Sequence, residues 1–393
     1  MLAARTRRRF TAYLVAAACA DSGYWIATIA QGWLVVKLTN SPMWLGLVSA
    51  AGQLPFLFFS LAGGYLADRF NRRFVIATNN VLLAGVATLT AMLVASGTIS
   101  IGWLALLGFI AGTLTALEHP VDRAWVYDLV EGHQLGRTIA LSALEWATAR
   151  TLGPAIGGAA VAAIGIAAAY GAYAVLVVPI AVLALALRTR NTSGDDAPPE
   201  TSASTAAPPH AIVVFSLFTG LFTIGVSPYQ ALLPDIAKNA FGQTASGYGL
   251  MAAAGGIGAI CGAVALSLRG EFAHRGRAAT IAALIGALLL VAFTRAHTLP
   301  LAIGVLVAMG FIDTLMYALG NTYVQQIAGD DARGRANAIF SVAFLGAIPV
   351  GNAVLGILAG RFGSGPVLGW SGTAVALAAV AFWYAFPRTR DAA

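Results

Sequence analysis

Long apolar runs separated by short polar segments follow one another along the whole chain. Each run has about the 20 residues that an α-helix needs to cross the hydrocarbon layer of a bilayer. An even number of crossings returns both ends of the chain to one side. The pattern predicts an all-α integral membrane protein with twelve transmembrane helices, at residues 10–38, 43–67, 74–95, 99–121, 138–164, 167–187, 211–233, 247–268, 278–295, 299–322, 336–360 and 367–386.

A compact charged segment lies between the second and third runs. Residues 64–73 read GYLADRFNRR, which places one acid and three arginines in a stretch too charged for lipid. This segment resembles the loop motif between helices 2 and 3 of the major facilitator superfamily, G-x-x-x-D-R-x-G-R-R, with Asn71 at the second glycine. The resemblance assigns the gate motif to Gly64, Asp68, Arg69, Arg72 and Arg73. It implies that Asp68 and Arg72 brace a cytoplasmic gate, with Asp68 facing the positive N-terminal end of the helix at 336–360.

Charge supports this topology. Hydrophobic residues make up 59% of the chain and charged residues 10%, well below the roughly 25% of soluble domains. Of the 23 Lys and Arg residues, 18 fall on one side of the twelve-span scheme, four on the other, and Arg150 within a span. Because positive residues collect on the cytoplasmic side, both termini are predicted to be cytoplasmic, in the cell (inner) membrane. The scattered arginine pairs argue against a nucleic-acid partner.

A low-complexity segment divides the spans six and six. Residues 191–209 are rich in Ser, Thr, Ala, Pro and acids, which is typical of a flexible linker. The predicted domains are an N-terminal six-helix bundle at 1–190, a cytoplasmic linker at 191–209 and a C-terminal six-helix bundle at 210–393. The halves repeat short features 198 residues apart: Gly136-Arg137-x-x-Ala140 matches Gly334-Arg335-x-x-Ala338, and Gly112 matches Gly310. Such repeats fit two bundles with a substrate site between them.

Further stretches narrow the resemblance. Residues 31–42 (QGWLVVKLTNSP), 120–130 (PVDRAWVYDLV) and 333–337 (RGRAN) are together similar to the third drug:proton antiporter family, which includes macrolide and siderophore exporters. The second-half loop motif is then Arg333, Gly334 and Arg335.

The span at 138–164 contains a stretch similar to the antiporter motif G-x-x-x-G-P-x-x-G-G, with Ala149 at the first glycine. The matching residues are Gly153, Pro154, Gly157 and Gly158. Proline removes a backbone hydrogen bond and glycine permits close helix approach, so a bendable contact between bundles is expected. Tight packing of small residues is the alternative.

Polar residues form a stripe along the first span. Asp21, Tyr24, Thr28 and Gln31 fall within about 80° of one helix face, bordered by Trp25. Ionisable residues within spans are costly and mark functional sites. This face is therefore predicted to line a cavity.

Arg150 is the one basic residue inside a predicted span and needs a partner. Glu145 lies about 140° away round the same helix and points elsewhere. Asp21 lies at a similar depth, because the two residues are roughly 16 Å and 18 Å from the same end of their helices. We expect an Asp21–Arg150 ion pair, which is either structural or part of ion coupling.

Three other features carry open alternatives. Asp313 lies roughly 12 Å inside its span, one turn from Tyr317 as a candidate partner. Because burial favours a protonated carboxyl group, Asp313 is either a proton carrier or a permanently neutral acid. Glu118 is expected to be an interfacial residue. The stripe of Ser216, Thr219, Thr223, Ser227 and Gln230 either lines a cavity or bonds to its own helix backbone.

These features favour a secondary active transporter working by alternating access. The chain has no G-K-S/T phosphate loop, so an ion gradient, most simply of protons, is the expected energy source. Family resemblance favours export of a small amphipathic molecule by a monomer without cofactor or metal. An importer of a small metabolite is the alternative, because fold does not set direction. An intramembrane enzyme is a remote one, since no H-E-x-x-H or G-x-S-x-G occurs.

Overall fold

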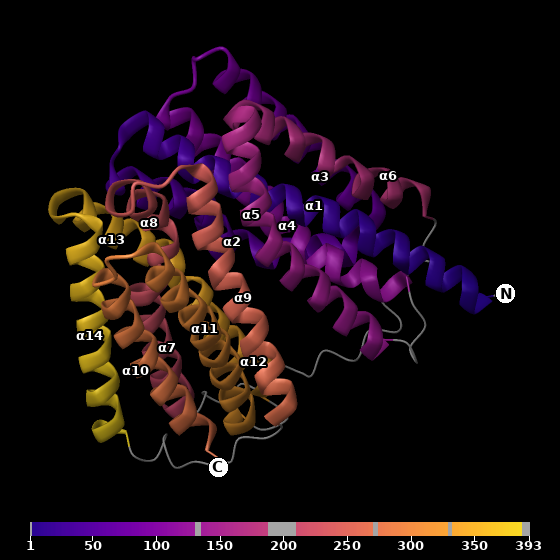
Figure 1. Ribbon diagram of the computed structural model, residues 1–393. Helices are drawn as coiled ribbons and strands as arrows, with labels where there is room; N and C mark the ends of the chain where they lie inside the picture. The colour runs from indigo at the N-terminus through magenta and orange to yellow at the C-terminus, as the bar shows by residue number, and fades with distance from the viewer. Residues whose placement is uncertain (1, 130–134, 188–209, 270–273, 329–331, 387–393) are drawn as a thin grey trace. The chain divides into compact units, whose positions relative to one another are not determined.

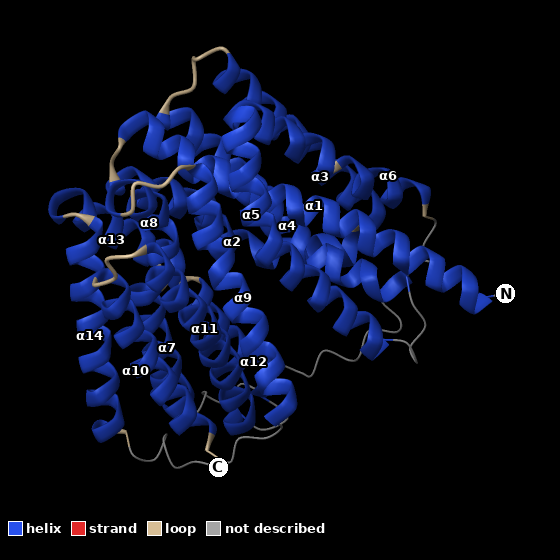
Figure 2. Ribbon diagram, in the orientation of Figure 1, coloured by secondary structure: helices blue, strands red, loops and turns tan. Residues whose placement is uncertain are grey.

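The computed structural model describes residues 2–129, 135–187, 210–269, 274–328 and 332–386, and within these ranges all regular structure is helical (Figures 1 and 2). The predicted linker at 191–209 lies outside the described residues. The helices are α1 Leu2–Thr39, α2 Pro42–Arg69, α3 Arg72–Ala95, α4 Ile101–Leu129, α5 Leu135–Leu176, α6 Val178–Ala186, α7 His210–Val226, α8 Tyr229–Asp235, the π-helix η2 Ile236–Ala240, α9 Ala245–Arg269, α10 Arg275–Thr294, α11 Leu299–Ala328, α12 Arg333–Leu345, α13 Ala347–Phe362 and α14 Ser364–Ala385.

The helices account for the twelve predicted spans. In the described part of the chain, ten helical segments are long and apolar enough to cross a membrane. One of these, residues 138–186, is 49 residues long and contains two predicted spans. They meet at Gly165, whose φ of 86° is a left-handed value that glycine adopts without strain. The remaining predicted span, residues 10–38, lies in α1, a continuous helix that carries the polar stripe and is not among these ten.

Two of the other spans are interrupted for local reasons. Pro228, which has no backbone N–H to donate, lies between α7 and α8. Gly346 separates α12 from α13. The π-helix η2 then follows α8 directly, and its i→i+5 geometry is visible in the 3.2 Å bond from the Phe241 N–H to the Ile236 carbonyl.

The chain forms two compact units. The first comprises residues 1–38, 51–197 and 244–253, and the second comprises residues 39–50, 198–243 and 254–393. In the first unit α3 packs against α4, α5 and α6; in the second, α10 lies beside α11 and α14, and α7 contacts α12 and α14. Each unit is thus a helix bundle around its own core.

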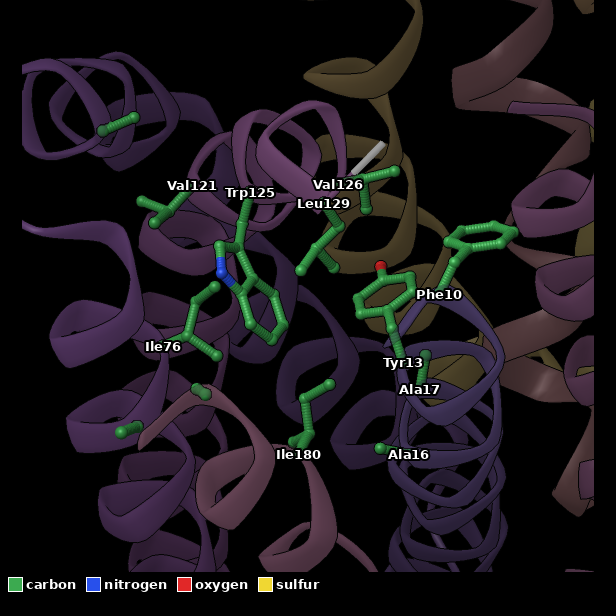
Figure 3. Packing of buried hydrophobic residues seen from close by; sticks show 13 residues of the cluster. Phe10, Tyr13, Ala16, Ala17, Ile76, Val121, Trp125, Val126, Leu129 and Ile180 are labelled. Atoms are coloured by element: carbon green, nitrogen blue, oxygen red, sulfur yellow. The ribbon is translucent and has the colours of Figure 1, made fainter. Parts of the chain in front are cut away.

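A buried cluster shows how the first unit is held together. Trp125 of α4 is completely buried, and its ring meets the edge of the Tyr13 ring of α1 at a centroid distance of 5.6 Å. Ile76, Val121 and Ile180 surround them from α3, α4 and α6 (Figure 3). Large aromatic side chains contribute much of the packing energy of such cores, so this cluster fixes four helices at one end of the bundle.

Glycine contacts set a matching helix crossing in each unit. In the first, a Cβ added to Gly112 of α4 would lie 1.9 Å from the Gly52 carbonyl oxygen of α2. In the second, a Cβ added to Gly310 of α11 would lie 2.0 Å from the Gly255 carbonyl oxygen of α9. Only glycine permits backbones to approach so closely. The repeated glycines found in the sequence therefore have the same packing role in both units.

Candidate functional site

The polar stripe of α1 meets α5 inside the first unit. The Trp25 ring stacks edge-on with Tyr24 at 5.4 Å and lies 6.0 Å from Trp146 of α5. Next to these rings, Trp25 Nε1, Ser142 Oγ and Glu145 Oε1 are buried and have no hydrogen-bond partner among the described residues. Buried polar atoms are nearly always paired. Three unpaired ones make this part of α1 and α5 a candidate site.

Two carboxyl groups meet at this contact. The carboxyl groups of Asp21 of α1 and Glu145 of α5 lie within interaction range of each other. Two ionised carboxylates at close range repel each other, and a proton on one of them removes that repulsion. The pair is therefore chemically able to hold a proton and to release it when the helices separate.

The predicted Asp21–Arg150 ion pair is wrong, because Asp21 contacts Glu145 instead. Arg150 lies within electrostatic range of the Tyr24 phenol. The depth estimate was sound to about one helical turn, since Glu145 and Arg150 differ by only five residues along α5. An error of one helical turn in depth is enough to exchange Arg150 for Glu145 as the neighbour of Asp21.

The glycines of the antiporter motif hold α5 against two helices of the same unit. A Cβ added to Gly153 would lie 2.6 Å from Trp25 Cβ, and one added to Gly157 would lie 2.9 Å from Ile26 Cα. One added to Gly158 would lie 2.5 Å from the Ala245 carbonyl oxygen at the start of α9. These close approaches bring Glu145 and the stripe of α1 together. The motif's predicted role as a contact between bundles stays a prediction.

The remaining stripe residues have local partners. The Thr28 hydroxyl donates to the Tyr24 carbonyl at 2.8 Å, within its own helix. Gln31 is half-buried, and its Nε2 lies 2.9 Å from where a Cβ on Gly108 of α4 would be. Gln31 therefore lies in a gap that this glycine leaves open.

Two further acids lie on α4, and sequence reasoning missed their connections. Glu118 accepts hydrogen bonds from the side-chain amides of Asn79 and Asn80 on α3. Asp122 accepts one from the Tyr13 hydroxyl at 2.8 Å. The expectation that Glu118 lies at the membrane interface stays a prediction, but two buried amides are committed to this side chain. The adjacent asparagines inside a span were the signal that could have revealed this network.

Comparison with known proteins identifies the family. The family model of transmembrane secretion effectors matches residues 2–392. The chain belongs to this family. A staphyloferrin A transporter of Staphylococcus aureus is 26% identical over 140 residues, which cover 35% of this chain and 34% of that transporter, about a third of its length.

Solved structures agree on the fold. A bacterial homologue of the iron transporter ferroportin in an inward-facing state superposes with a TM-score of 0.75 at 18% identity, covering 96% of this chain and 98% of that one. A D-xylose–proton symporter gives a TM-score of 0.70 at 14% identity, with 95% and 97% covered. The chain thus has the fold of these multi-pass membrane proteins. Its family excludes the alternative of an intramembrane enzyme.

The loop motif of this transporter family is anchored by an arginine. Arg72 donates to both carboxylate oxygens of Asp128 at the end of α4, at 2.8 and 2.9 Å, and to the Ala67 carbonyl at 3.0 Å. Asp68 is exposed, and its predicted contact with the beginning of α12 stays a prediction. Arg69 lies over the Tyr65 ring at 5.6 Å.

The other motif residues are simpler. Arg73 lies over the Phe74 ring at 4.6 Å, and nothing lies within 4 Å of a Cβ added to Gly64. In the second-half motif, Gly334 and Arg335 are exposed, and the Arg333 side chain lies outside the described residues. The structure therefore describes side-chain contacts for the first loop but not for the second. The gating roles of both loops stay predictions.

In the second unit, the candidate residues do not gather into one site. Asp313 is half-buried on α11. The Tyr317 ring packs on Phe344 of α12 at 5.1 Å, which gives it an aromatic rather than an acidic neighbour. On α7, the Thr219 and Thr223 hydroxyls are buried and bond to carbonyls of their own helix. For these two, backbone bonding replaces cavity lining.

Proposed function

We propose that the protein exports a small amphipathic molecule, as a monomer, and that protons moving down their gradient drive the export through the Asp21–Glu145 pair. The observation that carries the proposal is the proximity of these two carboxyl groups, one on α1 and one on α5. Coupling needs a group that is protonated in one conformation and ionised in another. Two carboxyls on different helices meet that need, because their contact holds a proton and their separation favours ionisation of both.

Neighbouring groups support a substrate site at the same place. The aromatic rings of Tyr24, Trp25 and Trp146 offer apolar faces, and the unpaired Trp25 Nε1 offers a donor. Amphipathic ligands are recognised by this combination of apolar walls and a few polar groups. The similarity to a siderophore transporter is consistent with a small-molecule substrate, while import of a small metabolite is the competing direction.

Transport in everted membrane vesicles tests the proposal. Wild-type protein should accumulate the amphipathic dye rhodamine 6G when the vesicle interior is acid, and a protonophore should abolish accumulation. Asp21→Asn and Glu145→Gln should each lose gradient-driven accumulation but keep downhill exchange of the dye. Asp313→Asn is the matched carboxyl-to-amide variant in the second unit, and it tests the other candidate acid. Undiminished accumulation in both Asp21→Asn and Glu145→Gln would refute coupling by the pair.

Orientation is part of the proposal. The 18-to-4 distribution of Lys and Arg favours cytoplasmic termini and a cytoplasmic linker between bundles at 1–190 and 210–393. A Glu200→Cys variant, in a background with Cys19 and Cys261 replaced by serine, should not react with an impermeant thiol reagent in intact cells. It should react in everted vesicles. Labelling in intact cells would reverse the orientation.

A further inference from the structure

A cavity of about 490 Å³ lies within the second unit, well apart in sequence from the Asp21–Glu145 pair. Its walls come from four turns: the one after α1, the π-helix η2, the end of α10 and the link between α13 and α14. The sequence places all four turns on the side opposite the arginine-rich loops. Ligand pockets have volumes of about 300 to 1,000 Å³, so the cavity has the size of a small-molecule site.

A buried acid lines the cavity: Asp235, the last residue of α8, is 7% exposed. One oxygen accepts a hydrogen bond from the Asn239 amide at 2.7 Å, and the other accepts one from the Ser364 hydroxyl. Both donors are neutral. A carboxylate offers about four acceptor positions, so two donors leave capacity for a further partner.

No cation of the described residues neutralises this carboxylate within 4 Å. The neighbouring Lys238 donates to the Asn40 side chain at 2.8 Å instead. Burying a charge is costly unless an opposite charge accompanies it. The local backbone is also unusual, because π-helical turns such as η2 are rare and occur often at functional sites. Asp235 therefore lines the cavity with no cation of the described residues within 4 Å of its carboxyl group.

The apolar part of the lining suits a particular cation. Phe241 and Phe293 both line the cavity with Asp235. Aromatic faces attract ammonium groups through their quadrupole, and a carboxylate adds a full opposite charge. Asp235 is the one acid among the described lining residues, and the other oxygen-bearing side chains, those of Asn40, Asn239, Thr294 and Ser364, are neutral. A multivalent inorganic cation prefers several carboxylate ligands, whereas one carboxylate beside aromatic rings suits a single ammonium charge.

From these observations we infer that this cavity binds an ammonium group carried on an apolar body, with Asp235 as its counter-ion. It is a second site, separate from the proton-coupling pair, on the face opposite the arginine-rich loops. The competing explanation is that Asp235 only ties α8 to the beginning of α14 through Ser364.

The test uses two probes of the same shape. Benzyltrimethylammonium carries a permanent positive charge, and neopentylbenzene is its neutral isostere. Affinities for the purified full-length protein are measured by saturation-transfer NMR titration, together with the thermal unfolding temperature. Wild type should bind the ammonium probe in preference to the isostere. Asp235→Asn should weaken ammonium binding by roughly tenfold or more and leave isostere binding unchanged.

Ser364→Ala is the matched control, because it removes the hydrogen bond from Ser364 to Asp235 and keeps the charge. It should lower the unfolding temperature but change ammonium affinity by less than about threefold, since the counter-ion stays in place. If Asp235 is only a structural tie, both variants will lose stability alike and Asp235→Asn will bind the ammonium probe as wild type does. That outcome, or equal binding of the two probes to wild type, overturns the inference.

A second measurement covers the case in which Asp235→Asn does not fold. Ala240 is exposed and lines the cavity, so Ala240→Cys in the Cys19→Ser, Cys261→Ser background reports occupancy while Asp235 is intact. Benzyltrimethylammonium should slow its reaction with a thiol reagent, and neopentylbenzene should not. Absence of protection by the ammonium probe contradicts the site. These binding assays use no gradient, so their outcome does not depend on whether the Asp21–Glu145 pair couples protons to transport.

Discussion

The two units share a helix crossing but differ in the charge they enclose. Gly112 on Gly52 in the first unit and Gly310 on Gly255 in the second bring corresponding helices equally close. Five of the described carboxyl groups of the first unit are buried or half-buried: Asp21, Glu118, Asp122, Asp128 and Glu145. Described acids of the second unit are fewer, and its buried one, Asp235, lies at a turn. The two units therefore share the glycine contact between helices but differ in the number and position of their buried acids.

The largest effects should come from the shared crossing. Gly112→Ala and Gly310→Ala each place a Cβ about 2 Å from a backbone oxygen, and backbone atoms cannot rotate away as a side chain does. Both variants should therefore lose most of the folded protein from the membrane, by a similar factor, in an assay of detergent-extracted monodisperse protein.

Controls lie on the same two helices. Gly102 of α4 has only the Ser100 hydroxyl near its added Cβ, at 3.9 Å, and Gly304 of α11 has nothing within 4 Å. Gly102→Ala and Gly304→Ala should accumulate as wild type. If Gly310→Ala is tolerated while Gly112→Ala is not, the packing equivalence of the units fails.

A smaller effect is expected at the loop of the first unit. The Asp128 side chain is 3% exposed and pairs with Arg72, so Arg72→Ala leaves a buried carboxylate without its cation. Breaking a buried pair costs about 3 kcal/mol or more, and the unfolding temperature should fall accordingly. The double variant Arg72→Ala, Asp128→Ala should regain part of that loss. A double variant as unstable as the single one would show that the pair is not what stabilises this loop.

Two exposed residues of the same loop separate stability from gating. Arg69→Ala should leave the unfolding temperature nearly unchanged, because Arg69 only lies over an exposed tyrosine ring. Asp68→Asn should also fold normally but impair transport, as its proposed gating role requires. Full transport by Asp68→Asn would remove Asp68 from the gate.

The fold could be predicted from the sequence because span length and charge asymmetry are properties of single segments. A run of about 20 apolar residues has few alternatives to a helix in a bilayer. Breaks were harder to place. The turn at Gly165 was predicted between spans, but the π-helix after Asp235 has no periodic signature in the sequence.

The site was predictable only in part, because periodicity gives the face of a helix and not its neighbour. The sequence predicted the stripe with Asp21 and Tyr24, but it did not predict Glu145 as the neighbour of Asp21. Choosing between Glu145 and Arg150 needs a depth accurate to less than 7.5 Å, which is the rise of five residues along a helix. The Asn79–Glu118 bond joins two helices, and no pattern within either helix encodes it.

The smallest effect tests the contrast between polar stripes in the two units. Thr223 of α7 is completely buried and donates to the Thr219 carbonyl at 3.0 Å. Thr28 of α1 makes the equivalent bond to the Tyr24 carbonyl at 2.8 Å but is only half-buried, beside the candidate site. Valine has nearly the shape of threonine, and each carbonyl keeps the backbone hydrogen bond of its helix.

Thr223→Val should therefore change stability by less than about 1 kcal/mol, because it leaves no buried group unpaired. Its transport of rhodamine 6G should match wild type. Thr28→Val should be equally stable but should alter the concentration of dye that gives half-maximal transport, by a few-fold, if the stripe of α1 lines the substrate path. Unfolding temperatures and concentration-dependent vesicle uptake of both variants decide this. Equal transport defects in the two variants would mean that the stripes of both units line the path, and that the division of roles between the units is wrong.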